Sequence, residues 1–247
     1  DVANANMDIL DNTVLSESRT PYKNIVSTLG GEMLVGDIND VVPYRLTATL
    51  PTDVTSFKHY HITFKDQMEP GLTFNEIEKV TVNGVDVNGY LFEQDGDQSF
   101  SVRLDWDGNG DYIADESLNG AKVEVFFSAT LNENAKLGKQ GNVNACKLAF
   151  SNNSLTDDEE DESELPWDYV IAFTYKVDVN KLNKSDDSPL EGAEFAIQKL
   201  TVTTNEKGET VYEELDGQEY AVSYDANTFT ATGLDDGLYR LSETKAP

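Results

Sequence analysis

Hydrophobic and polar residues alternate with a period of two along most of this chain. The clearest stretch is 41–51, where Tyr44, Leu46 and Leu50 fall on one side of an extended backbone. Because successive side chains of a strand point to opposite faces, this spacing predicts a half-buried strand. The same alternation recurs at 59–68, 79–92, 99–106, 121–131 and 143–153. Closely spaced strands of this kind predict an antiparallel β-sandwich.

A block of acidic residues interrupts this pattern. Seven of the ten residues at 156–165 are Asp or Glu, and such a block repels itself and stays solvated. Strand-like alternation resumes at 169–182 and continues towards the end of the chain. We therefore predict an N-terminal arm or remnant of a preceding domain at 1–19, a first sandwich at 20–156, an acidic linker at 157–168 and a second, C-terminally incomplete sandwich at 169–247.

Charge and composition exclude several classes of function. The formal net charge of −28 opposes binding to nucleic acids and to anionic membranes. No apolar run is long enough to span a bilayer, so no membrane span is expected. The single cysteine, Cys146, precludes a disulfide within the chain, and its apolar neighbours indicate a packing role. Neither a signal peptide nor a sorting motif is recognised, so we expect a mature or trimmed piece of a secreted protein.

Five polar residues share strand faces with apolar ones: Lys23, Asp66, Asn152, Lys181 and Glu243. A lone charge in a core is costly, so such residues are paired, neutralised or functional. Alternatively, the strand ends reach solvent, and these five residues are exposed there. In a core, burial lowers the pKa of a lysine and raises that of a carboxylic acid. A neutral lysine can then attack a side-chain amide while the acid shuttles protons and ammonia leaves. The fold supplies the proximity that replaces an external catalyst.

Two parts of the chain resemble known protein domains. One part comprises the segments VGDINDVVPYRLTATLP, FKDQMEPGLTF and VEVFFSATLNENAKLGKQGNVNACKLAFSNN. These segments resemble the D2-type domain of Gram-positive backbone pilins, which forms an internal isopeptide bond. The segment from FTYKVDVNKL to YRLSETKAP resembles a Cna-B-type domain, and YRLSETKAP matches the pilin E-box. Together they cover about residues 20–247. The resemblance implies tandem Ig-like (Cna-type) antiparallel β-sandwiches.

The resemblance also implies roles for the polar residues. Lys23, Asp66 and Asn152 match the lysine, acid and asparagine of the D2-type bond, and Asn153 is a neighbouring alternative that strand parity disfavours. Lys181 and Glu243 match the lysine and acid of the Cna-B bond. The asparagine partner of Lys181 is expected to lie on a strand absent from this chain. Each bond would form once, so the protein is not expected to be an enzyme.

The resemblance implies the shaft subunit of a sortase-assembled pilus in the cell wall, outside the cell. Its partners would be neighbouring pilin subunits, joined through sortase-made links. A minor pilin or cell-wall-anchored adhesin that grips a host extracellular ligand is the alternative, since loops carry such specificity.

One loop has the spacing of a calcium site. Residues 105–116, DWDGNGDYIADE, place oxygen ligands as an EF-hand loop does, at Asp105, Asp107, Asn109, Asp111 and Glu116. The flanking segments are predicted to be strands, so an acidic hairpin turn is the alternative. Calcium is the one cofactor suggested, and none is required. His59 and His61 lack an evident third ligand and are expected to be exposed on a strand.

Overall fold

The computed structural model describes residues 4–9, 25–28, 31–106, 116–155, 162–215, 220–225 and 227–247. Within them the named strands pair antiparallel, and the helical elements are two short 3-10 turns, η2 (Val54–Ser56) and η3 (Glu116–Leu118). The prediction of an all-β fold is therefore confirmed. The chain divides into a first unit, of residues 1–34, 39–135 and 142–172, and a second unit, of residues 35–38, 136–141 and 173–247. Among the described residues, no helix has the length and apolar character needed to cross a bilayer.

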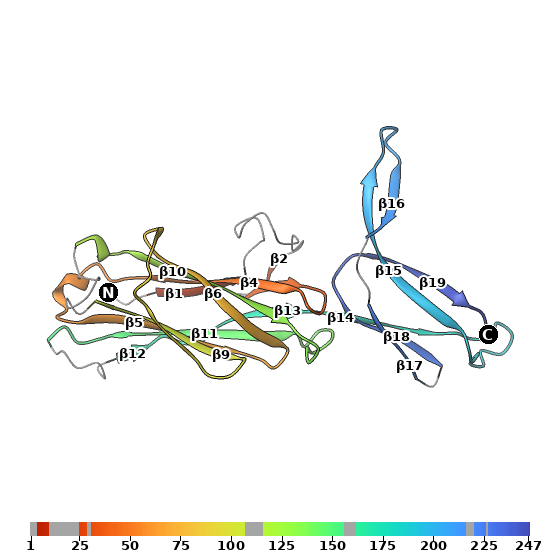
Figure 1. Ribbon diagram of the computed structural model, residues 1–247, viewed down its shortest axis with the longest axis horizontal. Coiled ribbons are helices and arrows are strands. Elements are labelled where there is room, and N and C mark those ends of the chain that lie inside the picture. The colour runs from red at the N-terminus through yellow and green to blue at the C-terminus, as the bar shows by residue number, and fades with distance from the viewer. Residues whose placement is uncertain are drawn as a thin grey trace. The chain divides into compact units, whose positions relative to one another are not determined.

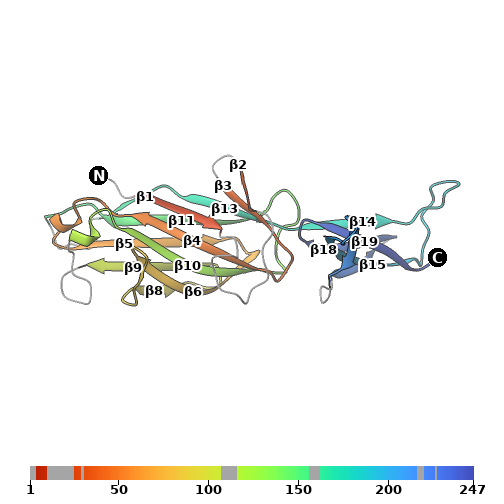
Figure 2. The ribbon, with the colours of Figure 1, turned by 90° about the horizontal axis from the view of Figure 1, so that it is seen from above.

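Two sheets form the first unit, and Figure 1 shows them as two layers. One sheet has the order β1 (Asn4–Ile9), β4 (Val41–Thr49), β10 (Lys122–Leu131), β6 (Leu72–Val82) and β7 (Val85–Asp86). Figure 2 shows β4 and β10 side by side, as their register from Lys122↔Thr49 to Thr130↔Val41 requires.

The other sheet of the first unit is longer. Its order is β2 (Ile25–Thr28), β3 (Gly31–Val35), β13 (Asp168–Phe173), β11 (Asn142–Ser151), β5 (Tyr60–Met68), β9 (Ser99–Trp106) and β8 (Leu91–Gln94). A short strand, β12 (Glu162–Glu164), also pairs with β11.

Alternating apolar residues of both sheets build the core of the first unit. On β9, Phe100, Val102, Leu104 and Trp106 are buried while the residues between them are half-buried. Aromatic rings join the sheets, as where Phe127 of β10 meets Phe100 of β9 with ring centroids 4.9 Å apart. Burying a side chain of this kind stabilises the fold by about 1.5–3 kcal/mol.

The boundaries of the first unit differ from the predicted ones. Strand β1 lies inside the predicted N-terminal arm but pairs with β4 along all six of its residues. The predicted acidic linker contains β12 and the first residue of β13, and both strands pair with β11. The acidic residues of β12 are tolerated because Glu164 accepts hydrogen bonds from Lys65 (2.9 Å) and Lys147 (2.5 Å). The acidic composition of this segment predicted a linker, but the pairing of its acids with lysines of other strands allows it to form a strand.

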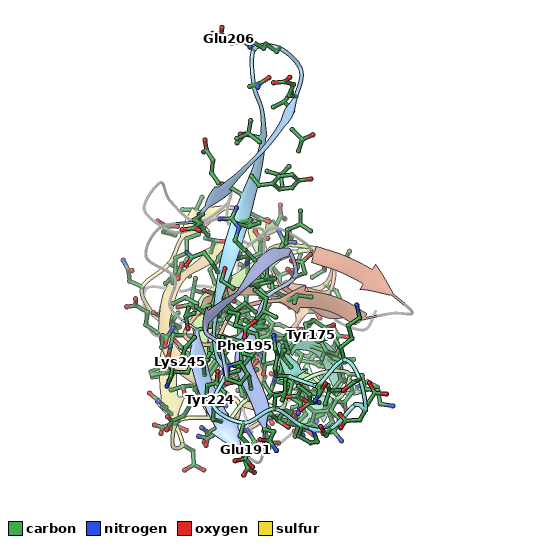
Figure 3. The ribbon with its side chains drawn as sticks, turned by 90° about the vertical axis from the view of Figure 1, so that its right-hand side faces the viewer. Tyr175, Glu191, Phe195, Glu206, Tyr224 and Lys245 are labelled. Atoms are coloured by element: carbon green, nitrogen blue, oxygen red, sulfur yellow. The ribbon has the colours of Figure 1, made fainter. Side chains whose placement is uncertain are left out.

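The second unit is a smaller sandwich of two three-stranded sheets. One has the order β14 (Tyr175–Asn180), β18 (Thr228–Leu234) and β17 (Ala221–Asp225), and the other β16 (Thr210–Glu214), β15 (Glu194–Thr204) and β19 (Leu238–Lys245). The core is Ile197, Phe229, Ala231 and Leu234. The hairpin of β15 and β16 extends beyond this core, with Glu206 near its tip (Figure 3).

Candidate functional site

Asp66 is a carboxylic acid inside the first sandwich. It lies on β5 and is 2% exposed, and the register pairs it with Cys146 of β11. Asn144 lies on the same face of β11 as Cys146 and is fully buried. It donates a hydrogen bond from Nδ2 to Asp66 Oδ2 at 3.2 Å. Burial raises the pKa of Asp66 well above its usual value, although the Asn144 bond opposes the shift. Burial therefore favours the neutral form of this acid, which lies against a primary amide.

The other predicted members of this site lie elsewhere. Asn152 follows the end of β11, is exposed, and donates from Nδ2 to Ser163 Oγ at 2.9 Å. It is eight residues beyond Asn144, or roughly 26 Å along an extended strand. Asn153 also lies in this loop, where its Oδ1 accepts the Leu155 N–H at 3.1 Å. The structure thus brings Asn144, and not Asn152, to Asp66. Lys23 lies outside the described residues.

The neighbours of Asn144 on β11 show how this end of the core is filled. Asn142 is fully buried and donates from Nδ2 to the Ala172 carbonyl at 3.2 Å. A Cβ at Gly71 would lie 2.1 Å from Asn142 Oδ1, so this position requires glycine. On the other side of Asn144, burial and then the Asp66 charge raise the pKa of the Cys146 thiol. The thiol is therefore a neutral packing group.

Lys181 and Glu243 come together as predicted for the second sandwich. Lys181 Nζ lies 2.7 Å from Glu243 Oε2, with the two side chains 34% and 31% exposed. At this exposure the ion pair is partly screened by water. A groove of about 270 Å³ adjoins Lys181, lined in part by Val179, Phe195 and Tyr224. Phe195 and Tyr224 are labelled in Figure 3.

The predicted calcium loop is described only at its two ends, Asp105 and Glu116, while Asp107, Asn109 and Asp111 lie outside the described residues. The Asp105 carboxylate accepts two hydrogen bonds from Arg103, at 3.2 and 3.0 Å, and another from His59. Across the described part of the chain, no three His, Cys, Asp or Glu side chains are arranged to hold a metal ion.

The expectation that both histidines are exposed is wrong. His59 is half-buried, with its side chain 12% exposed. His61 is 1% exposed, with Nδ1 2.8 Å from Ser151 Oγ and Nε2 2.8 Å from Glu162 Oε1. Burial lowers its pKa, with the nearby Arg103 charge adding to the effect. The sequence could not show that β12 folds back beside this histidine.

Comparisons with known proteins agree with the resemblance. Residues 175–247 match the family described as SpaA: Prealbumin-like fold domain. The chain is 25% identical over 232 residues to the trypsin-resistant surface T6 protein of Streptococcus pyogenes serotype M6, covering 85% of this chain and 39% of that protein. The chain therefore spans well under two thirds of this relative.

Solved structures share the fold. The 35 kDa C-terminal fragment of the major pilin GBS80 of Streptococcus agalactiae matches with a TM-score of 0.64 and 19% identity, over 100% of this chain and 87% of the fragment. The T6 backbone pilin of Streptococcus pyogenes matches with a TM-score of 0.64 and 18% identity, over 100% of this chain and 49% of the pilin. The major pilin SpaD of Corynebacterium diphtheriae matches with a TM-score of 0.59 and 20% identity, over 99% of this chain and 56% of SpaD. At these identities the likeness shows the fold alone.

Proposed function

We propose that this chain, a homologue of the backbone pilins of Gram-positive bacteria, is part of the shaft subunit of a sortase-assembled pilus on the cell surface. The observation that carries the proposal is the agreement of both sandwiches with major-pilin structures along the whole chain. A shaft subunit transmits load and carries out no turnover, so it acts as a structural protein and not as an enzyme. Its partners are neighbouring subunits, joined through sortase-made links in the cell wall.

The first unit supports an internal cross-link between Lys23 and Asn144, with Asp66 as the acid. Lys23 stands two residues before β2, which belongs to the same sheet as β11 and β5. Asn144 replaces Asn152 as the proposed partner because Asn144 is buried and bonded to Asp66. Glu243, in the E-box-like segment, and Lys181 are proposed as the acid and lysine of a second bond, because their side chains meet at 2.7 Å.

The chemistry of the first bond follows from burial. A neutral Lys23 amine attacks Cγ of Asn144, and the protonated Asp66 donates to the amide oxygen as negative charge develops there. Asp66 then takes the proton that the new amide nitrogen loses and delivers one to the departing amine, which leaves as ammonia. Lys23 and Asn144 are consumed, whereas Asp66 ends as it began.

The shaft proposal is tested on cell-wall extracts of the source bacterium, with an antibody raised against this chain. A shaft subunit gives a ladder of high-mass polymers that survive boiling in detergent, and deleting the sortase collapses the ladder to monomer. A single band in both strains would overturn the proposal. Immunogold labelling separates it from the adhesin alternative, because a shaft subunit is labelled along the whole fibre and a minor pilin only at isolated points.

A further inference from the structure

The outer face of the longer sheet of the first unit carries a groove of about 680 Å³. Strands β11, β5, β9 and β8 lie side by side beneath it. The register places Lys147 opposite Lys65, Lys65 opposite Ser101, and Ser101 opposite Glu93. At about 4.8 Å between neighbouring strands, this row spans roughly 14 Å. We call this feature the outer groove; its volume lies within the range of about 300–1,000 Å³ that is usual for small-ligand sites.

Short side chains on β9 form the floor of the outer groove. Ser99 and Ser101 both line it, while Phe100 between them points into the core. A serine is much shorter than the lysine and the glutamate that flank Ser101 on β5 and β8. Ser99 Oγ donates to the carbonyl of Asp66 at 3.2 Å, and the Asp66 side chain is buried. The hollow therefore follows from the sequence of β9.

Trp167 provides an aromatic surface on the β11 side of the outer groove. It is 36% exposed, whereas Trp106, the other tryptophan of the chain, is buried in the core. Lys147 Nζ lies 5.1 Å from the centroid of the Trp167 ring, a cation–π contact that holds the indole in place. The faces of aromatic rings carry partial negative charge and attract polarised C–H groups. Sugar rings present C–H groups of this kind on one face, so Trp167 is suited to stack against a sugar.

Hydrogen-bonding groups lie on the other side of the outer groove. Glu93 and Asp95 are exposed, and neither carboxylate forms an ion pair with a residue that the structure describes. Their oxygens are therefore open to accept hydrogen bonds from a ligand, and Gln67 on β5 can both donate and accept. A ligand with many hydroxyl groups matches this set, because each hydroxyl also donates and accepts.

The charges around the outer groove favour an uncharged ligand. Lys65 and Lys147 already share the Glu164 carboxylate, at 2.9 and 2.5 Å. The two lysines of the lining are matched in number by the carboxylates of Glu93 and Asp95. A polyanion would be repelled by the formal net charge of −28, and a polycation would meet the two lysines. A neutral ligand incurs neither cost.

We propose that the outer groove binds a neutral oligosaccharide. One sugar ring stacks on Trp167, and hydroxyls of the neighbouring sugars donate to Glu93 and Asp95. The groove is open to water, so the affinity is low, with a Kd on the order of 1 mM. The site is independent of the internal cross-links and of the shaft role, so either proposal stands if the other fails.

The test is a tryptophan-fluorescence titration of the purified full chain. The probes are a trimer of N-acetyllactosamine, a tetramer of N-acetylglucosamine and maltohexaose. The first represents glycans of animal cell surfaces, the second bacterial wall glycans and the third plain glucose chains, so the preferred probe identifies the source. Because Trp106 is buried, a saturable change in emission reports on Trp167. At least one probe is expected to give this change, with the same Kd between about 0.05 and 0.5 M salt, since screening does not act on an uncharged ligand.

Variants locate the binding site. The double variant Glu93→Gln, Asp95→Asn is expected to weaken binding by on the order of 10-fold, because charged acceptors make the stronger hydrogen bonds. Trp167→Ala is expected to abolish binding, measured by saturation-transfer NMR of the sugar because the fluorescent group is gone. Tyr212→Ala removes an aromatic residue of the second unit that is 52% exposed, and this matched control should bind as the wild type does.

Three results would overturn the proposal. The first is no saturable change with any of the three probes at about 10 mM, roughly ten times the expected Kd. The second is binding that persists in Trp167→Ala. The third is an oligolysine peptide that binds more tightly than every sugar and is released by salt, which would assign the groove to a cationic partner. If Trp167→Ala does not fold, as judged by circular dichroism, the double variant decides, because both of its changes are at exposed residues.

Discussion

Replacing Asn144 with alanine is expected to abolish the cross-link of the first unit, whereas replacing Asn152 leaves it intact. The two asparagines have the same parity in the sequence, but Asn152 lies beyond the end of β11 and only Asn144 contacts Asp66. Asn152 is exposed and bonded to Ser163, so its alanine variant serves as the matched control. The two variants therefore decide between Asn144, the partner that the structure supports, and Asn152, the partner that the sequence predicted.

The size of the effect follows from the loop that the bond closes. A link from Lys23 to Asn144 spans about 120 residues, and the chain-entropy relation for cross-links gives roughly 5 kcal/mol for this length. For a domain of this size that is roughly 10–20 °C in melting temperature. Asn144→Ala also breaks a buried hydrogen bond, at a further cost of about 1–3 kcal/mol. Asn152→Ala should change stability by no more than about 0.5 kcal/mol.

Intact mass shows whether the cross-link has formed, and thermal unfolding measures how much stability it adds. The wild type and Asn152→Ala are expected to be lighter than their sequence masses by one ammonia, and Asn144→Ala is not. Lys23→Arg lacks the cross-link but keeps the bond between Asn144 and Asp66. The difference between Lys23→Arg and Asn144→Ala therefore reports the local cost alone.

Two results would refute this reasoning. Ammonia loss that persists in Asn144→Ala and disappears in Asn152→Ala would restore Asn152 as the partner. A wild type at its full sequence mass, with Lys23→Arg melting within a degree or two of it, would exclude the cross-link.

Three further predictions concern single groups. In the Lys23→Arg background the melting temperature should fall as pH rises, because burial raises the folded-state pKa of Asp66 above its usual 3.8. The stabilising contribution of the neutral Asp66 is full below about pH 4 and is lost as pH rises through the raised pKa. Asp66→Asn should therefore flatten the plot of melting temperature against pH, and an unchanged slope in this variant would contradict the prediction. Lys181→Ala should cost less than about 1 kcal/mol in a denaturant titration, since its ion pair with Glu243 is one-third exposed, and a larger loss would indicate a cross-link there. Millimolar calcium should raise the melting temperature only slightly, because Arg103 already binds Asp105. The double variant Asp105→Ala, Asp107→Ala should remove this rise, and a large rise in the wild type would show that the loop binds calcium tightly.

The strands and the all-β class could be predicted because alternation is a local property of the sequence. Asp66 could be singled out for the same reason, as a charge in an apolar row. Its partner could not, because Asn144 and Asn152 have equal parity and only the register of β11 against β5 separates them. Register depends on contacts between distant segments, which one sequence does not display.

The contact of Lys199 with Asp235 and Asp37 shows the same limit more strongly. Lys199 and Asp235 are 36 positions apart, and Asp37 comes from a segment that leaves the first unit for four residues. Neither residue pattern nor spacing joins these three positions. The short acidic strand β12 was missed for a related reason, since its charges are balanced by Lys65 and Lys147 from other strands.

The pairing of β13 with β11 determines where tension enters the first unit. Thr174 alone separates β13 from β14, so a pull on the second unit through the chain reaches β13 first. The load passes into β11 through the pairs Ala172↔Asn142 and Val170↔Asn144. With Asn144 joined to Lys23, force arriving at the third residue of β11 continues through a covalent bond. Under the proposed bond, the residues between Lys23 and Asn144 lie outside the covalent path of the load, so tension does not have to unravel them.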